Sequence, residues 1–174
     1  MEVVVDTYAW CLLGNHFHLL VRVKEEEEIG HMPSKNESSF KLTPQSGQKA
    51  TDGVYKKYKP SNQFSHLFNS YAQAFNKQTK RHGSLFESPF KRILVDSESY
   101  FQTLICYIHN NPVHHGFTNN ATDYPWSSYH TAISLKPTKL KRYQLLGLFG
   151  STENFVKYHQ QKQNYIAIEK LIIE

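Results

Sequence analysis

The sequence has 174 residues, 39% of them hydrophobic, and a formal net charge of +5. This length favours a single domain with its own core. We find no run of about 18 apolar residues and no signal-peptide layout, so we expect neither a membrane span nor a membrane partner. The basic charge favours an anionic partner such as nucleic acid without identifying one. Cys11 and Cys106 stand in apolar surroundings, which predicts buried thiols and a cytoplasmic protein.

The N-terminal part of the chain predicts a β-hairpin. Residues 3–13 and 17–23 are rich in β-branched and aromatic side chains, and Gly14-Asn15 supplies the turn. Alternate side chains of a strand share a face, so His16 and His18 point the same way. We expect the opposite face to be the core face, formed by Phe17, Leu19, Val21 and Val23. Two neighbouring imidazoles can hold a metal ion, although such pairs also occur in strands that bind none.

A polar stretch without periodicity runs from about residue 29 to about residue 60 and predicts a long loop or insertion. The apolar spacing that follows predicts an amphipathic helix with Ser61 as N-cap and an end near Gly83. Three cations gather near the C-terminal end of this helix, namely Lys77, Lys80 and Arg81. They suit either the helix dipole or a phosphate backbone.

The segment from Ser84 to Asp96 predicts a strand or an irregular hairpin, and a second helix follows. That helix is expected to begin near Asp96 or Ser97. We expect it to end at about Asn111, because proline at position 112 disfavours a helical conformation in the residue before it.

Two polar side chains of this second helix share one side of it. Tyr107 and Asn111 stand at an i, i+4 spacing, about a quarter turn from the apolar stripe, where a side chain can reach into a cleft. A tyrosine at the edge of the core and an asparagine that terminates a helix are the simpler interpretations. A phenol with a pKa of about 10 is a poor nucleophile, but a divalent cation can help it attack a phosphate. Two imidazoles and an amide oxygen suit Mg²⁺ or Mn²⁺.

The motifs "GNHFHLLVRV" and "CYIHNNPVHHGF" together resemble the single-tyrosine HUH transposases, and most closely their REP-associated branch. In that family a His-hydrophobic-His strand precedes a helix with the pattern Tyr-Ile-x-x-Asn-Pro-Val-x-x-Gly. The segments "FNSYAQAFNKQTKRHGSLFESPFKR" and "DYPWSSYH" are also similar to family segments. The resemblance covers roughly residues 3–129, apart from the polar insertion.

The resemblance implies an α+β, ferredoxin-like fold: an antiparallel sheet with helices on one face. It implies that His16, His18 and Asn111 bind the metal and that Tyr107 attacks a phosphate of single-stranded hairpin DNA, forming a 5′-phosphotyrosine link. Such DNA would be held by basic side chains and stacked on aromatic ones. The candidates for backbone contact are Lys77, Lys80, Arg81, Lys91 and Arg92. Trp126, Tyr124 and Tyr129 either stack on bases or pack a loop against the core.

The chain departs from the family pattern at its N-terminus. Family members carry a strand and a helix before the segment equivalent to Val3, so we expect a sheet that lacks them. An open strand edge is then predicted, which favours a homodimer or instability. We expect residues 1–130 to form the transposase-like domain and residues 131–174 to form a helical extension of it. In this C-terminal part, two short helices are predicted, the second capped by Ser151 or Thr152.

Three functional hypotheses remain at this point. The first is a metal-dependent transposase that nicks and rejoins single-stranded DNA. The second is a truncated or domesticated relative that binds hairpin DNA without cleaving it. The third is a metal-binding structural domain with no role in nucleic-acid chemistry.

Overall fold

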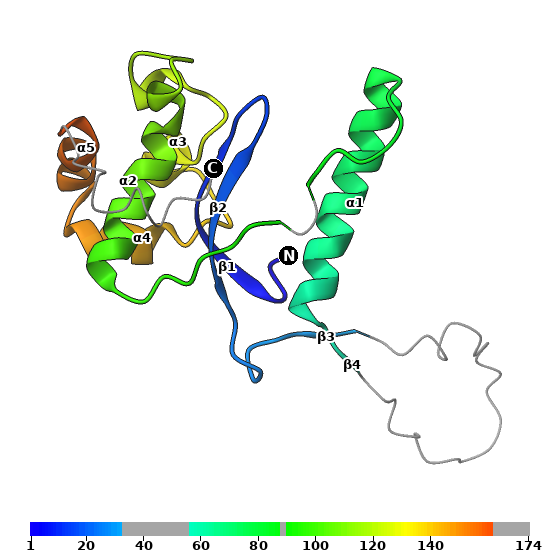
Figure 1. The fold of residues 1–174 in the computed structure, drawn as a ribbon. Helices are drawn as coiled ribbons and strands as arrows, with labels where there is room; N and C mark the ends of the chain where they lie inside the picture. The colour runs from blue at the N-terminus through cyan, green and yellow to red at the C-terminus, as the bar shows by residue number, and fades with distance from the viewer. Residues whose placement is uncertain (33–55, 88–89, 162–174) are drawn as a thin grey trace, which may run out of the picture. The chain divides into compact units, whose positions relative to one another are not determined.

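The computed structural model describes residues 1–32, 56–87 and 90–161. Its elements in chain order are β1 (Val5–Leu12), β2 (Phe17–Val23), β3 (His31–Met32), β4 (Lys56–Lys57), α1 (Pro60–Thr79), α2 (Glu98–His114), η2 (Ala121–Asp123), α3 (Tyr129–Ile133), α4 (Arg142–Phe149) and α5 (Thr152–Gln160) (Figure 1). The predicted α+β class is confirmed, because β1 and β2 form a two-stranded antiparallel sheet accompanied by several helices. This is consistent with a ferredoxin-like sheet that lacks strands. No helix among the described residues is long and apolar enough to cross a membrane.

Tertiary contacts divide the chain into two compact units. The first unit contains residues 3–5 and 23–85, and the second contains residues 6–22 and those from 86 onward. The predicted division into residues 1–130 and 131–174 stays a prediction. Most of the predicted polar insertion, residues 33–55, lies outside the described residues.

The first unit consists of the strand pair β3–β4 and the helix α1. His31 pairs with Lys57 in an antiparallel register, so the two ends of the predicted insertion lie side by side. Helix α1 begins one residue before the predicted N-cap Ser61, because Pro60 occupies its first turn. Proline favours that position, since its φ is helical and its missing N–H would have no partner there. Lys80 ends the helix in a left-handed conformation with φ of 55°.

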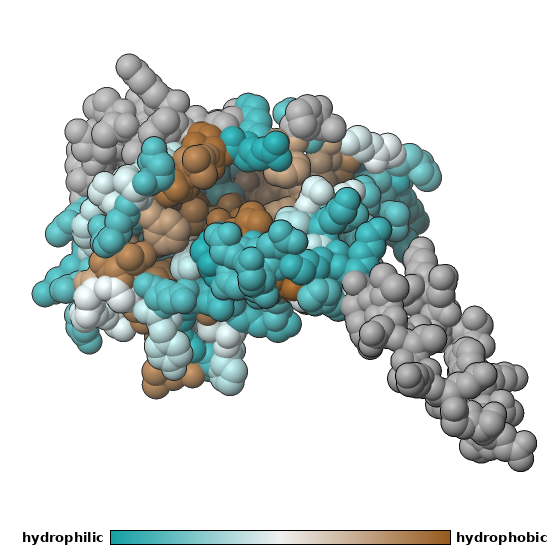
Figure 2. Space-filling view, turned by 90° about the horizontal axis from the view of Figure 1, so that it is seen from below, coloured by the Kyte–Doolittle hydropathy of each residue, from teal (hydrophilic) through white to brown (hydrophobic). Residues whose placement is uncertain are grey.

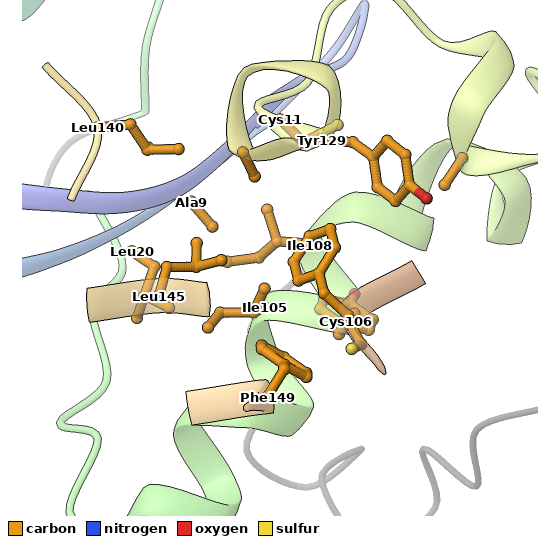
Figure 3. Packing of buried hydrophobic residues seen from close by; sticks show 14 of the residues in the cluster. Ala9, Cys11, Leu20, Ile105, Cys106, Ile108, Tyr129, Leu140, Leu145 and Phe149 are labelled. Atoms are coloured by element: carbon orange, nitrogen blue, oxygen red, sulfur yellow. The ribbon is translucent and has the colours of Figure 1, made fainter. Parts of the chain in front are cut away.

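The core of the second unit lies between the hairpin and α2. Figure 3 shows side chains from β1, β2 and α2 converging there, together with residues of α3, α4 and the segment before α4. The buried set includes Ala9, Cys11, Leu20, Ile105, Cys106, Ile108, Tyr129, Leu140, Leu145 and Phe149. Both cysteines are buried free thiols, as predicted. Helices α2 to α5 lie on one side of the hairpin (Figure 1).

The predicted core face of β2 was wrong. Leu20, which shares a face with His16 and His18, is buried in the core cluster, whereas Phe17 and Val21 are only partly buried. Alternation assigns side chains to two faces but does not say which face a helix covers. Both faces of β2 carry apolar residues, and α2 packs against the one with the histidines. The two imidazoles therefore stand at the end of the core and beside α2.

The predicted end of α2 at Asn111 was also wrong, because the helix continues through Pro112 to His114. A proline in the last turn removes only one helical hydrogen bond. Two other bonds close the end: Gly116 N–H donates to Val113 O at 3.1 Å, and Phe117 N–H donates to Pro112 O at 2.8 Å. This is the Schellman pattern, which requires a left-handed residue at Gly116. The turn that follows Asn111 is thereby held in place.

This end of α2 allows a direct test of backbone conformation. Gly116 has φ of 71°, whereas Gly147 within α4 is not left-handed, and a Cβ on either glycine would meet no atom within 4 Å. We expect Gly116→Ala to lower the free energy of unfolding by about 1 kcal/mol. Gly147→Ala should raise it by about 0.5–1 kcal/mol. Urea denaturation of both variants measures these changes, and a change of the same sign in both would contradict the interpretation.

The segment predicted to be a strand or hairpin, residues 84–96, contains no strand in its described part. Phe90, Ile93 and Leu94 are exposed in it, Leu94 by 84%. Figure 2 shows hydrophobic surface between hydrophilic residues on one face of the molecule. Apolar sequence alone was therefore not enough to predict strand pairing here, because a strand also needs a neighbouring strand.

The two edges of the hairpin differ. Leu12 N–H donates to Trp126 O, Ser128 N–H to Trp10 O, and Lys141 N–H to Thr7 O, which covers the outer edge of β1. In the described part of the chain, β2 has β1 as its only neighbouring strand. The predicted open edge stays a prediction.

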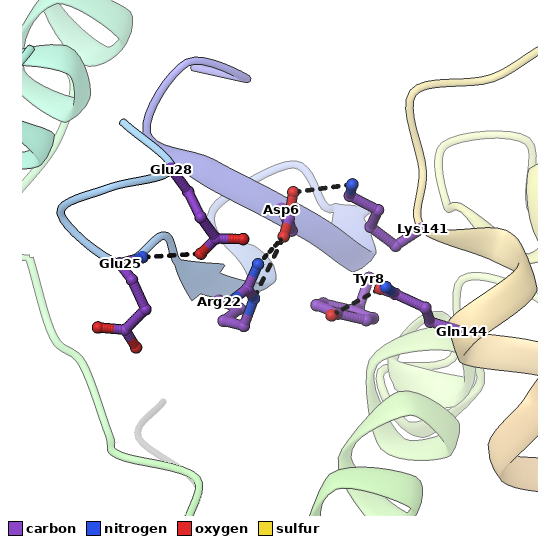
Figure 4. Close-up of polar contacts among 7 residues, drawn as sticks. All are labelled: Asp6, Tyr8, Arg22, Glu25, Glu28, Lys141 and Gln144. Carbon is purple, nitrogen blue, oxygen red and sulfur yellow. Dashed lines mark hydrogen bonds and ion pairs between the residues drawn. The ribbon is translucent and has the colours of Figure 1, made fainter. Parts of the chain in front are cut away.

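A buried carboxylate joins the two strands to the start of α4 (Figure 4). Asp6 is 4% exposed. Its carboxylate accepts a hydrogen bond from Arg22 Nε at 3.2 Å and forms an ion pair with Lys141 Nζ at 3.1 Å. Burial raises the pKa of the Asp6 carboxyl, but hydrogen bonds and charges from Arg22 and Lys141 outweigh burial and bring it below the ordinary value. The charged carboxylate thus helps to fix β1 against its neighbours.

Candidate active site

The two histidines of the hairpin lie next to the C-terminal part of α2. The ring centroids of His16 and His18 are 5.1 Å apart, so the predicted pair is formed. His16 Nε2 lies 3.2 Å from Asn111 Oδ1, and Asn111 is fully buried. On the other side of the ring, His16 Nδ1 lies 2.9 Å from Asn15 Oδ1. Asn15 was predicted only to form the turn, because its contact with the neighbouring ring has no sequence signature.

The donor atoms around His16 fit a cation. Each ring nitrogen of His16 faces an amide oxygen. In the tautomer with the proton on Nδ1, the oxygen of Asn15 accepts a hydrogen bond and the Nε2 lone pair of the neutral ring faces the amide oxygen of Asn111. Two ligand atoms each about 2.1 Å from an ion and at a right angle would lie about 3.0 Å apart. The observed separation of 3.2 Å is close to that value. A hydrogen bond on the second ring nitrogen is also the usual way in which a histidine ligand is oriented.

Tyr107 lies beside this group. Its ring centroid is 5.5 Å from that of His18, with the two planes nearly perpendicular. The structure thus brings together His16, His18, Asn111 and Tyr107, which the sequence placed on two separate elements. Tyr107 is 5% exposed and Asn111 is fully buried, so the expectation that both would stand at the edge of the core was wrong. The hairpin histidines cover them.

Two further histidines, His114 and His115, complete the surroundings. The ring of His115 lies 5.0 Å from that of His16, and the ring of His114 stacks at 6.0 Å on that of Tyr107. Neither histidine was predicted to have a role. The i, i+7 spacing from Tyr107 to His114 was a usable signal, but it was lost because the helix was expected to end at Asn111. No cluster of three His, Cys, Asp or Glu side chains with metal-binding geometry occurs among the described residues.

A buried chain of hydrogen bonds anchors α2 on its other side. His159 Nδ1–H donates to Phe155 O at 2.8 Å, which leaves Nε2 to accept a hydrogen bond from His109 Nδ1–H, also at 2.8 Å. Ser128 Oγ lies 2.8 Å from His109 Nε2 and accepts a hydrogen bond from the backbone N–H of Trp10. The chain therefore connects α5, α2 and β1 through two neutral imidazoles.

Both rings of this chain are difficult to protonate. Burial lowers the pKa of His159 to about 4, against a smaller opposing effect of its hydrogen bond to Phe155. Burial and the neighbouring His159 lower the pKa of His109 well below the ordinary value. We therefore assign these two histidines to the positioning of α2 and not to the site itself.

The predicted DNA-contact residues lie in separate places. Lys77, Lys80 and Arg81 line a shallow hollow at the end of α1 in the first unit, together with Gln73, Asn76, His82 and Gly83. Lys91 and Arg92 are exposed on the extended segment of the second unit.

The aromatic loop is divided between core and surface. Tyr129 is 1% exposed and belongs to the core, and Tyr124 Oη–H donates to Leu12 O at 2.7 Å. Trp126 is 62% exposed. Packing against the core therefore accounts for two of the three aromatic residues, whereas the indole of Trp126 remains accessible to a base.

Comparison with curated proteins finds a relative in Haemophilus influenzae, named "Putative REP-associated tyrosine transposase". The two sequences are 26% identical over 130 residues, which is 74% of this chain and 61% of that protein. The chain thus spans about three fifths of the relative's length. No family model matches the chain. No solved structure matches it either.

Proposed function

We propose that this protein cleaves and rejoins single-stranded hairpin DNA, with Tyr107 as the nucleophile. The observation that carries the proposal is the convergence of Tyr107 with His16, His18 and Asn111. The name of the Haemophilus relative supports a transposase-like function. Tyrosine beside two imidazoles and a buried amide is a site that can combine a covalent nucleophile with a divalent cation.

The reaction exchanges one phosphate ester for another. The phenol oxygen of Tyr107 forms a bond to phosphorus, and the bond from phosphorus to the 3′ oxygen of the preceding nucleotide breaks. The phenol proton is lost, the departing 3′ oxygen gains a proton, and the 5′ strand end stays attached to the tyrosine. Nothing is oxidised or reduced. Attack by a 3′-hydroxyl on the phosphotyrosine reverses these bond changes and joins two strands.

The residues of the hairpin and α2 divide the remaining tasks. His16, His18 and Asn111 would hold Mg²⁺ or Mn²⁺, which when bound supplies positive charge to the phosphate oxygens. Asn15 orients the His16 ring through its Nδ1–H. Asn111 Nδ2 is buried with no hydrogen-bond partner among the described residues, so it is a donor available for a phosphate oxygen or water.

Basic side chains and one indole are proposed to hold the DNA. Lys77, Lys80 and Arg81 gather cationic groups in one hollow, and Lys91 and Arg92 add exposed charge in the second unit. Contacts of this kind give an affinity that falls with salt concentration. Trp126 offers a stacking surface for an unpaired base.

The test uses the full chain and end-labelled single strands that carry a hairpin. With Mn²⁺ we expect a covalent protein–DNA adduct that survives denaturing electrophoresis, carries the 5′ strand end and maps to Tyr107 by mass spectrometry. Chelation with EDTA should prevent its formation. Adduct formation at an equal rate in EDTA would contradict the metal assignment, and an adduct at another residue would contradict the nucleophile.

A second candidate is a module that binds hairpin DNA without cleaving it. The observation that favours it is the two-stranded sheet, which gives the site fewer supporting strands than a complete ferredoxin-like sheet. Tight, salt-sensitive binding of the same DNA with no adduct under any divalent ion would favour this candidate. Absence of binding even at low salt would leave the structural metal domain.

A further inference from the structure

Five ring side chains form one continuous series around the site. The ring of His115 contacts that of His16, His16 contacts His18, His18 contacts Tyr107, and Tyr107 contacts His114. Centroid distances along the series are 5.0, 5.1, 5.5 and 6.0 Å. The series begins at His115, directly after the end of α2. It passes through His16 and His18 at the start of β2 and returns to α2 at Tyr107 and His114. The end of α2 and the residue after it therefore contact both the proposed nucleophile and a proposed metal ligand.

The Tyr107 ring lies between two other rings of this series, which we call its walls. His18 meets its ring edge-on, at 76° between the planes, whereas His114 lies nearly parallel to it, at 21°. Tyr107 is 5% exposed, but His114 itself is exposed to solvent. His114 thus forms the outer wall that separates the phenol ring from water.

His114, which forms the outer wall, lies on a backbone turn that is restrained on both sides. Pro112 has a fixed φ, and the hydrogen bonds of Gly116 and Phe117 close the turn on both sides of His114. A side chain on such a turn has few backbone conformations available. It can therefore restrict the motion of a ring that it covers.

We propose that His114 is a positioning residue that holds the Tyr107 ring against His18. The functional consequence rests on the proposed strand-transfer reaction. Without the outer wall, the Tyr107 side chain has room to leave the histidine pair. Since small errors in the position of a nucleophile cost large factors in rate, we expect His114→Ala to slow adduct formation about 10-fold to 100-fold. The aromatic variant His114→Phe keeps the wall and should stay within about 3-fold of the natural protein.

The first experiment measures the ring position without reference to activity. The eleven tyrosines are replaced by 3-fluorotyrosine, and the ¹⁹F resonance of Tyr107 is assigned by its loss in Tyr107→Phe. We expect His114→Ala to move this resonance toward that of a solvent-exposed fluorotyrosine, and His114→Phe to leave it close to its original position. The other tyrosine resonances report whether the variant is folded.

A matched control removes an exposed histidine beside a different tyrosine. His130 contacts the ring of Tyr129 at 5.6 Å, so His130→Ala should move the Tyr129 resonance and leave that of Tyr107 unchanged. An unmoved Tyr107 resonance in His114→Ala would overturn the proposal. An equal movement in His114→Ala and His114→Phe would also overturn it, because the ring shape would then not matter.

The second experiment measures the rate of adduct formation at saturating hairpin DNA with Mn²⁺. A positioning role predicts a loss of rate in His114→Ala with unchanged DNA affinity, and recovery in His114→Phe. Equal loss in both variants would mean that His114 acts through a hydrogen bond or charge and would overturn the proposal. If the natural protein forms no adduct, the proposed function fails, and the ¹⁹F resonance still decides whether His114 positions Tyr107.

Discussion

Replacement of Tyr107 by phenylalanine should abolish the covalent capture of hairpin DNA. The substitution removes the oxygen that attacks phosphorus and leaves the ring between His18 and His114. His16, His18, Asn111 and His114 carry no hydroxyl group that could replace the phenol oxygen, so we expect a loss of more than about 1,000-fold in adduct formation. The free energy of unfolding should change by no more than about 1 kcal/mol, because only one hydroxyl is lost. DNA affinity should remain close to that of the natural protein.

The measurement combines denaturing electrophoresis of adducts with a filter-binding or anisotropy assay of DNA affinity. Tyr143→Phe is the matched control, since Tyr143 is 86% exposed on α4 and should leave both quantities unchanged. Persistence of the adduct in Tyr107→Phe would show that another residue carries the DNA. Loss of both adduct and binding would instead indicate that the phenol contributes to holding the strand.

Acidification should destabilise the protein between pH 6.5 and pH 4. His159 has a pKa of about 4 in the folded chain, below its ordinary value of 6.5. Between these values the unfolded chain binds a proton that the folded chain does not, so stability falls as the pH is lowered. At about 1.4 kcal/mol per pH unit, this histidine alone accounts for a loss of about 3 kcal/mol by pH 4. His109 adds to the loss in the same direction.

Urea denaturation at a series of pH values from 7.5 to 4 measures this loss. In His159→Leu the titrating ring and its bonds to Phe155 and His109 are absent, so the variant should be less stable at neutral pH but should lose less on acidification. The slope of stability against pH is the deciding quantity. An unchanged slope in His159→Leu would show that other groups cause the acid sensitivity.

The local parts of the fold were predictable because their signals are local. The Gly14-Asn15 turn and the two flanking strands were found. Of the alternatives predicted for two helix starts, Ser97 and Ser151 are the N-caps, and they accept hydrogen bonds from Tyr100 N–H and Asn154 N–H. The i, i+4 spacing of Tyr107 and Asn111 placed both on one side of α2. Each of these features depends on residues within a few positions of one another.

The predictions that were wrong concern which surfaces of the elements pack against one another. Alternation along β2 left the covered face undecided. In the structure, Leu20 of β2 belongs to the same core cluster as Ile105 and Ile108 of α2. Pro112 indicated a helix end, but the bonds that Gly116 and Phe117 make around it allow another turn. His114 lies in that extra turn. Because the helix was expected to end at Asn111, the position of His114 beside Tyr107 was not predicted.

The unequal edges of the hairpin limit how copies of this chain can associate. A sheet can grow into a filament only if every molecule has two open strand edges. Each added molecule then leaves one open edge to which the next can pair. In the described residues, the outer edge of β1 makes backbone bonds with Trp126, Ser128 and Lys141, whereas β2 has β1 as its only neighbouring strand. If the predicted open edge is the outer edge of β2, association through strand pairing is self-limiting, because two hairpins joined along β2 have no further open edge for a third molecule.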